Sequence, residues 1–248
     1  MNVYQQVFQS KNKSFAVLID PDKTGPFQVE TTLNTINSIN EISAIFVGGS
    51  LVADGSTQQL IQYIRKNTTK PVVLFPGNVN QICEADAILF LSLISGRNPE
   101  YLIGQHISGA PLIKKLGLEA IPTGYLLIGE PSSTAYVSNT TPIPNNKPDL
   151  AVATALAGEM LGQSLIYMDA GSGATNPISE DMISKVSGSL NSPLIIGGGI
   201  RTYEDAKKAL IAGAHCIVVG NAAETNAAIL FEIASAVSDI NRSLEVHQ

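Results

Sequence analysis

Short, wholly apolar runs alternate with amphipathic segments along the whole chain. The runs are rich in Ile, Val, Leu and Phe and span residues 15–19, 44–47, 72–75, 87–91, 125–128, 165–168, 194–197 and 216–220. Because these runs are apolar throughout rather than alternating, they are typical of parallel strands that are buried on both faces. Between most of them apolar residues recur at helical spacing, over 57–66, 150–161, 203–212 and 226–237. The pattern therefore predicts eight strands separated mainly by helices.

Eight strand–helix units in 248 residues fit a (β/α)8 TIM barrel better than a doubly wound open sheet, which usually has fewer strands. No linker-like stretch divides the chain, so we expect residues 1–248 to form one domain. The segment between the third and fourth strands, PGNVNQICEAD, is short, and a stunted helix is expected there. The longest irregular stretch, residues 129–149, follows the fifth strand and is expected at the C-terminal mouth of the barrel, as a lid or a contact surface.

Composition narrows the choice of function. The formal net charge of −6 argues against a nucleic-acid-binding surface, which would need a basic stripe. Cys83 and Cys216 lie far apart, without the spacing of a zinc site. The N-terminus lacks the apolar core of a signal peptide, and no window is long enough to span a bilayer. We therefore expect a cytoplasmic protein.

Glycines gather at the ends of the last three predicted strands. GSG at 171–173 follows the sixth strand, GGGIRT at 197–202 the seventh and GNAAET at 220–225 the eighth. In a barrel, the loops after strands seven and eight commonly bind phosphate, because glycines let backbone N–H groups approach an anion closely. Thr202 stands where it would cap the following helix, whose N-terminus favours negative charge. These loops predict a phosphate site; tight turns without a ligand are the alternative.

Polar residues at the ends of the first two strands form a second group. LIDPDK at 18–23 brings Asp20, Asp22 and Lys23 to one strand end, and Ser50 closes GGS at the next. Magnesium uses one or two carboxylates together with substrate phosphate oxygens. The group therefore predicts a magnesium corner, with Lys23 facing an anion; a solvated Asx-type turn is the alternative.

A carboxylate lies beside the predicted phosphate site. Asp169 ends the sixth strand, and Tyr167, two residues earlier, is expected on the same face. A carboxylate in this position could accept the proton of a bound hydroxyl. Tyr167 would orient a polyol or simply pack. The layout suits a small phosphorylated alcohol at one side of the mouth and a magnesium diphosphate at the other.

Longer stretches carry a family resemblance. IDPDK, FVGGS, FPGNVNQI, LFLSLISGRNPEYLIGQH, EAIPTGYLLI, YMDAGSGA, IIGGGIR and IVVGNA run in order from the first strand to the eighth, and they resemble the geranylgeranylglyceryl-phosphate synthases, in their archaeal-type branch. Bacterial heptaprenylglyceryl-phosphate synthases are related to that family. The resemblance implies a magnesium-dependent prenyltransferase of ether-lipid biosynthesis. It would join geranylgeranyl diphosphate to the free primary hydroxyl of sn-glycerol 1-phosphate and release diphosphate.

The resemblance also implies residue roles. Magnesium would bind Asp20 and Ser50, and Asp169 would be the general base. The family usually has Glu at that last position, so the carboxylate here is shorter by one methylene. Apolar residues of LSLISG and YLIGQHISGAPLI are candidates for the walls of a groove for the prenyl chain, and ordinary packing within the barrel is the alternative. Glycerol phosphate would contact Tyr167, Met168, Asp169, Ala170, Gly171, Ser172, Gly173, Gly198, Gly199, Gly220 and Asn221.

The resemblance suggests a homo-oligomer, such as a hexamer. Because the product would be a lipid phosphate and no basic amphipathic helix stands out, we expect at most transient membrane contact, and the acidic net charge predicts no nucleic-acid partner. Two other readings stay open from the residues alone. A barrel isomerase, aldolase or synthase could use the same phosphate site on another small substrate, although no strand run carries the lysine of a Schiff-base aldolase. A phosphate-binding protein without turnover is the non-enzymatic alternative.

Overall fold

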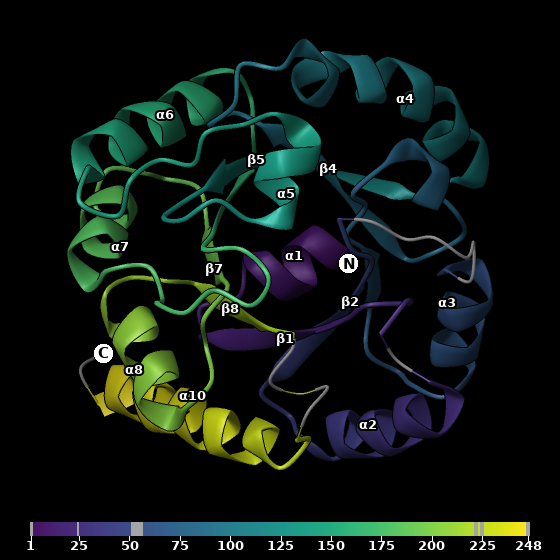
Figure 1. The fold of residues 1–248 in the computed structure, drawn as a ribbon. Coiled ribbons are helices and arrows are strands. Elements are labelled where there is room, and N and C mark those ends of the chain that lie inside the picture. Colours follow the sequence, from purple (N-terminus) through teal and green to yellow (C-terminus); the bar gives the residue numbers. More distant parts are fainter. Residues whose placement is uncertain (1, 24, 51–56, 221–222, 224–225, 247–248) are drawn as a thin grey trace.

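Eight parallel strands form a closed barrel in the computed structural model, which describes residues 2–23, 25–50, 57–220, 223 and 226–246. Each strand pairs with the next along the chain, and β1 also pairs with β8, which closes the cylinder (Figure 1). The strands are β1 (Ser14–Ile19), β2 (Ile42–Val47), β3 (Val72–Leu74), β4 (Ala87–Leu93), β5 (Glu119–Leu127), β6 (Leu165–Asp169), β7 (Leu194–Gly197) and β8 (Cys216–Val219). The predicted (β/α)8 barrel is confirmed.

Helices form the outer ring of the barrel (Figure 1). The connection after β3 holds only a single 3₁₀ turn, η1 (Val79–Gln81), as the short PGNVNQICEAD segment predicted. Before α4, the chain makes a π-helical turn, η2 (Glu100–Gly104). The helices of the ring are α2 (Pro26–Ser38), α3 (Thr57–Lys66), α4 (Gln105–Leu116), α6 (Pro148–Met160), α7 (Glu180–Ser187), α8 (Tyr203–Ile211) and α10 (Ile229–Val246).

The strands bury both faces in two separate hydrophobic layers. Side chains such as Phe46, Leu89 and Tyr167 fill the inside of the barrel, whereas neighbours such as Ile45 and Ile88 pack outward against the helices. Side chains alternate between the two faces of a strand, so each strand must be apolar at nearly every position. This double burial explains the continuous apolar runs in the sequence.

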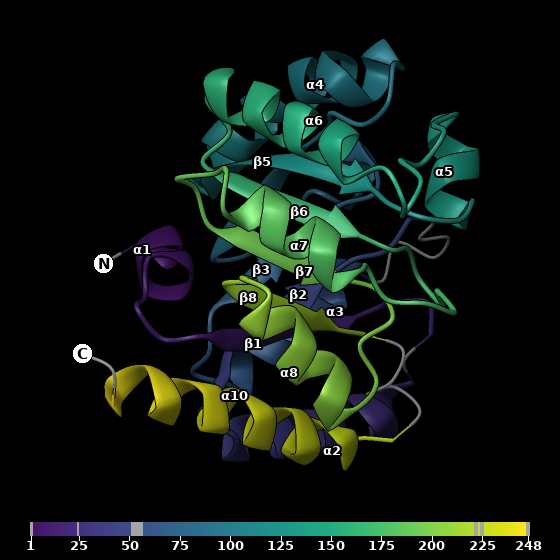
Figure 2. The ribbon, with the colours of Figure 1, turned by 90° about the vertical axis from the view of Figure 1, so that its left-hand side faces the viewer.

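A short helix that the strand and helix pattern did not predict closes the end of the barrel at which the strands begin, called here the lower end. α1 (Val3–Phe8) lies beyond the starts of the strands, and Figure 2 shows it opposite the mouth. Val7 and Phe8 are fully buried in the inner layer. The Glu119 carboxylate accepts hydrogen bonds from the backbone N–H groups of Val3 (2.6 Å) and Tyr4 (2.9 Å). These N–H groups of the first turn have no acceptor within the helix, so the carboxylate supplies one.

The irregular stretch after β5 lies at the mouth, as predicted, and contains α5 (Ser133–Ser138) (Figure 2). β5 itself begins at Glu119, ahead of the apolar run at 125–128. The sequence pattern did not reveal this beginning, because Pro122 lies within it and proline inside a run argues against a strand. It is tolerated because pairing with β6 starts only at Thr123. No helix within the described residues is both long and apolar enough to cross a lipid bilayer.

Candidate functional site

Two adjoining hollows occupy the C-terminal mouth of the barrel. A polar cavity lies at the ends of β1, β2, β6, β7 and β8 and encloses about 1050 Å³, including space open to solvent. An apolar cleft of about 860 Å³, counted in the same way, runs from it over β3 and β4 toward α4. Both hollows are lined by the same five residues at their junction: Gly49, Ser50, Phe75, Tyr125 and Thr134.

Glycine turns form one wall of the polar cavity. Gly171 and Gly198 have φ angles of +94° and +78°, in the left-handed region that side chains disfavour. At Gly198 an added Cβ would lie 2.7 Å from the Asp169 Oδ1 atom and 2.9 Å from the Ala170 nitrogen. Gly173, Gly199 and Gly220 line the same cavity. These glycines therefore let the loops after β6 and β7 pack closely at the rim of the polar cavity, where the sequence predicts a phosphate site.

The start of α8 stabilises this wall. Thr202 caps the helix as predicted, and the Asp205 carboxylate accepts hydrogen bonds from the N–H groups of Arg201 and Thr202, each 3.1 Å long. The Arg201 guanidinium donates to the carbonyl of Ala174 at 2.6 Å and thereby links the loops after β6 and β7. Because Asp205 already engages these N–H groups, donors for an anion would come from the glycine turns.

Asp169 is buried at the centre of the mouth and is held by two donors. The Tyr125 hydroxyl donates to its Oδ2 atom, and the Gly171 N–H donates to Oδ1 at 2.8 Å. Burial raises the pKa of the Asp169 carboxyl, and the two hydrogen bonds act in the opposite direction. The Tyr167 ring lies 5.3 Å from that of Tyr125, in register on the neighbouring strand. The arrangement presents a fixed carboxylate to the cavity.

Oxygen ligands suited to magnesium lie on the opposite wall. Asp20 and Ser50 line the polar cavity, and the Gly49 backbone is packed against the Asp20 carboxylate, which would lie 3.1 Å from an added Cβ. Ser50 shares a 2.6 Å hydrogen bond with Thr134 of α5. One carboxylate and one hydroxyl fit magnesium, which binds few protein oxygens and takes others from phosphate. Among the described residues, no cluster of three or more His, Cys, Asp or Glu side chains could hold a metal.

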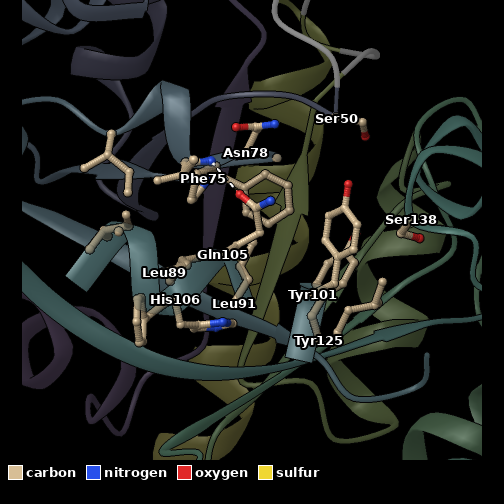
Figure 3. A pocket seen from close by; sticks show the side chains of 18 of the residues that line it. Ser50, Phe75, Asn78, Leu89, Leu91, Tyr101, Gln105, His106, Tyr125 and Ser138 are labelled. Carbon is tan, nitrogen blue, oxygen red and sulfur yellow. Dashed lines mark hydrogen bonds between the residues drawn. The ribbon is translucent and has the colours of Figure 1, made fainter. Parts of the chain in front are cut away.

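The apolar cleft has aliphatic and aromatic walls from β4, α4 and η1 (Figure 3). Leu91 and Leu93 of β4, together with Gly109 of α4, belong to the stretches expected to wall a prenyl groove. On the cleft wall, His106 shares a 3.2 Å hydrogen bond with Ser92 and packs edge-on against Phe90. Burial lowers the pKa of the His106 imidazole, so at neutral pH this wall carries no charge.

Most of the residues named from the sequence lie together in the polar cavity: Asp20, Ser50, Tyr167, Asp169, Gly171, Ser172, Gly173, Gly198, Gly199 and Gly220. Met168 and Ala170 do not line it. The Met168 side chain is buried in the outer hydrophobic layer, and the Ala170 N–H donates to the Gly197 carbonyl at 3.0 Å. Asn221 lies outside the described residues.

Three residues at the junction were missed by the sequence reasoning. Tyr125 lies within an apolar run, where the inward and outward positions look alike. Thr134 belongs to the irregular stretch after β5, whose path the sequence does not fix. Phe75 belongs to FPGNVNQI, which matched the family, yet the residues alone assigned it no role. The register of Tyr125 with Tyr167 would have been the signal, had the strand ends been known.

Comparison with known proteins identifies the family of the chain. Residues 6–237 match the model of the PcrB family. The chain belongs to this family. A geranylgeranylglyceryl phosphate synthase of Chitinophaga pinensis is 52% identical over 91% of the chain and 90% of the relative. The synthase of Pyrococcus furiosus is 43% identical over 95% and 94%. The family resemblance expected from the sequence is confirmed.

Solved structures of the family share the fold. The crystal structure of (S)-3-O-geranylgeranylglyceryl phosphate synthase from Thermoplasma acidophilum, in complex with the substrate sn-glycerol-1-phosphate, superposes with a TM-score of 0.89. It is 30% identical and covers 98% of this chain and 99% of its own. The wild-type enzyme of Thermoplasma volcanium has the same TM-score at 34% identity, with 98% of each chain covered.

Proposed function

We propose that the protein is a geranylgeranylglyceryl phosphate synthase, which transfers a prenyl group from its diphosphate to the primary hydroxyl of sn-glycerol 1-phosphate. The observation that supports this most is the continuity of the two hollows. A polar cavity with a glycine wall and a buried carboxylate opens into an apolar cleft across Tyr125 and Phe75. An acceptor phosphate and a prenyl chain can therefore be held on either side of Asp169.

The acceptor would bind at the glycine wall. Backbone N–H groups of the turns at Gly173 and Gly198 would hold its phosphate, and Tyr167 would pack against its glycerol. The free hydroxyl would then face Asp169. Because the pKa of Asp169 is raised by burial, its carboxylate is a stronger base than an exposed aspartate, and it takes the hydroxyl proton as the new carbon–oxygen bond forms.

The prenyl diphosphate would place its chain in the apolar cleft and its diphosphate beside Asp20 and Ser50. Burial of the chain is favourable by about 0.8 kcal/mol per CH2 group removed from water. Magnesium, when bound there, would draw charge from the leaving diphosphate. Thr134 of α5 lines both hollows and shares a hydrogen bond with Ser50. α5 would therefore cover the reacting groups.

The decisive experiment is incubation of the purified protein with sn-glycerol 1-phosphate and labelled prenyl diphosphates of several lengths, with and without magnesium. We expect an ether product, with the highest yield from the geranylgeranyl donor. Turnover should be lost when a chelator is added and should be restored by added magnesium. The absence of product with every donor would exclude the synthase. Turnover that is unchanged in chelator would exclude the magnesium requirement alone.

We also propose that the chain forms a homo-oligomer. Ile103 of η2 and Ile107 of α4 lie one turn apart and are 57% and 69% exposed, and Met160 and Leu161 at the end of α6 are about four-fifths exposed. Contiguous apolar patches on a protein surface mark contact sites, and Ile103 and Ile107 are neighbours on one helix face. Light scattering of the purified protein should give a mass of two or more times the chain's 26.1 kDa, and a monomeric mass would contradict this.

A further inference from the structure

Lys23 lies between the two sides of the polar cavity. Its Nζ atom is 3.0 Å from the Asp20 Oδ2 atom and 3.5 Å from the Ser172 hydroxyl. Asp20 belongs to the proposed magnesium corner after β1, and Ser172 to the glycine loop after β6. The ammonium therefore spans the space where two phosphorylated substrates would approach each other.

The Lys23 ammonium and a metal ion would compete for the same oxygen. A cation bound at Asp20 would meet the positive charge of Lys23 at the distance of a direct contact, where repulsion is strong. The Lys23 side chain is 46% exposed, whereas that of Asp20 is only 14% exposed, so the lysine is the partner that can move. Binding of a metal at Asp20 would therefore displace the ammonium.

Among the described residues that line the cavity, Arg201 is the other cation, and it has a different task. Its guanidinium donates to the carbonyl groups of Gly173 and Ala174, so it links loops of the cavity wall. Lys23 has a flexible stem and a compact charge, which suits a cation that changes partners. Once displaced from Asp20, its ammonium already lies beside the loop proposed to hold phosphate.

We propose that Lys23 is a movable cation of the reaction: it neutralises Asp20 while the metal site is empty and moves to a substrate phosphate oxygen when the metal binds. The proposal rests on the proposed function, since it takes Asp20 as the metal ligand and a phosphorylated substrate as the occupant. Lys23 would then act in two opposite ways. It weakens metal binding to the protein alone, and it strengthens binding of phosphate once the metal is present.

Binding experiments with the Lys23→Met variant test both effects without turnover. Titration with Mn²⁺, followed by water-proton relaxation, should show metal binding about threefold tighter than in the wild type, as for removal of an exposed ion pair. Calorimetry at saturating Mn²⁺ should show about tenfold weaker binding of a phosphate ligand, through loss of a charge-assisted hydrogen bond. Inorganic diphosphate and sn-glycerol 1-phosphate are titrated separately. The ligand whose affinity falls in the variant is the one whose phosphate Lys23 contacts.

Two further variants complete the test. Lys23→Arg keeps the charge and should restore most of the phosphate affinity. Lys185→Met breaks a comparable Lys–Asp pair, 2.9 Å long, on the outer surface at α7, and should leave both affinities at the wild-type value. The proposal is overturned if Lys23→Met leaves metal affinity unchanged or lower, or if neither phosphate ligand binds more weakly. A protein that makes no ether but shows both effects would refute the proposed function and not the role of Lys23.

Discussion

Two hydrogen bonds fix the Asp169 carboxylate. One of them comes from the phenol hydroxyl of Tyr125, which is buried together with Asp169 inside the barrel. This phenol stabilises the charged form of the carboxylate, against the burial that raises its pKa. In Tyr125→Phe the pKa of Asp169 should rise further, so the base is protonated over more of the pH range. We expect the acidic limb of the kcat/KM profile to move up by about one pH unit, the value of one hydrogen bond to a charged group.

The pH–rate profile of Tyr125→Phe needs a matched control. Tyr203 of α8 donates a 2.7 Å hydrogen bond to Asp239 of α10, and neither residue lines either hollow. Tyr203→Phe removes the same type of bond and should leave the acidic limb where it is. An acidic limb that stays in place in Tyr125→Phe, or moves equally in both variants, would show that Tyr125 does not set the pKa of Asp169.

Asp169 also links activity with stability. Its folded pKa lies above its unfolded pKa, so the folded state binds the proton more tightly, and stability falls as pH rises from the unfolded value through the folded one. At pH 7 the ionised group is therefore a cost to folding. Asp169→Asn should reduce kcat by about 10²–10⁴-fold while its Tm at pH 7 stays equal or rises. Calorimetry should show nearly unchanged affinity for sn-glycerol 1-phosphate; a variant that turns over normally would remove Asp169 from catalysis.

At the scale of elements, α5 forms a wall shared by both hollows. Val137 lines the apolar cleft, whereas its neighbour Tyr136 is 89% exposed and lines neither hollow. Val137→Ser should raise the KM for the prenyl diphosphate about fivefold, because about 1 kcal/mol of apolar contact is lost. The KM for sn-glycerol 1-phosphate should not change. Tyr136→Ser is the control on the same helix, and an equal effect of both substitutions would mean that α5 does not contact the prenyl chain.

The elements that the sequence predicted well are those with long, uniform patterns. α3 begins and ends where the apolar spacing of 57–66 predicted, and β7 occupies 194–197 as expected. α1 was not recognised because it has six residues, fewer than a periodic pattern needs, although Asn2 caps it and Val3 and Val7 lie one turn apart. The start of β5 was hidden by Pro122, whose position relative to β6 only the sheet register reveals.

The candidate site follows the same division. Asp20, Asp169 and the glycine turns could be placed together because parallel strands in a barrel all end at one mouth. Tyr125 and Thr134 could not be assigned. The first requires knowing which face of β5 turns inward, and the second requires the path of the chain between β5 and α6. Both depend on packing between segments that are distant in sequence, which a local pattern does not carry.

Across the whole molecule, aromatic rings connect the closed lower end of the barrel with the site at the mouth. Phe8 of α1 contacts Phe46, which stacks on Phe75, and the ring centroids are 6.5 and 6.4 Å apart. Phe75 in turn lies 5.9 Å from Tyr125 and 5.4 Å from Tyr167. The ring positions of the two tyrosines therefore depend on a column that fills the barrel from end to end.

The lower end of this column can be tested apart from the chemistry. Phe8 is fully buried, so Phe8→Ala should lower the free energy of unfolding by about 3–5 kcal/mol. For a chain of this length that corresponds to a fall in Tm of about 6–20 °C. Scanning calorimetry measures this, with Phe231→Ala as the control, because Phe231 on α10 is 55% exposed and its removal should change Tm little.

The same variant decides whether the column has more than a structural role. α1 lies at the end of the barrel where the strands begin (Figure 2), whereas the polar cavity is lined by residues at the strand ends. Phe8→Ala should therefore keep most of its turnover when it is assayed well below its Tm. A close-packed interior transmits strain until neighbouring side chains relax to absorb it. Three rings, those of Phe46, Phe75 and Tyr125, separate Phe8 from Asp169. An unchanged Tm would contradict the closing role of α1. Lost turnover in protein that is still fully folded would show instead that the position of Tyr125 is set from the far end of the barrel.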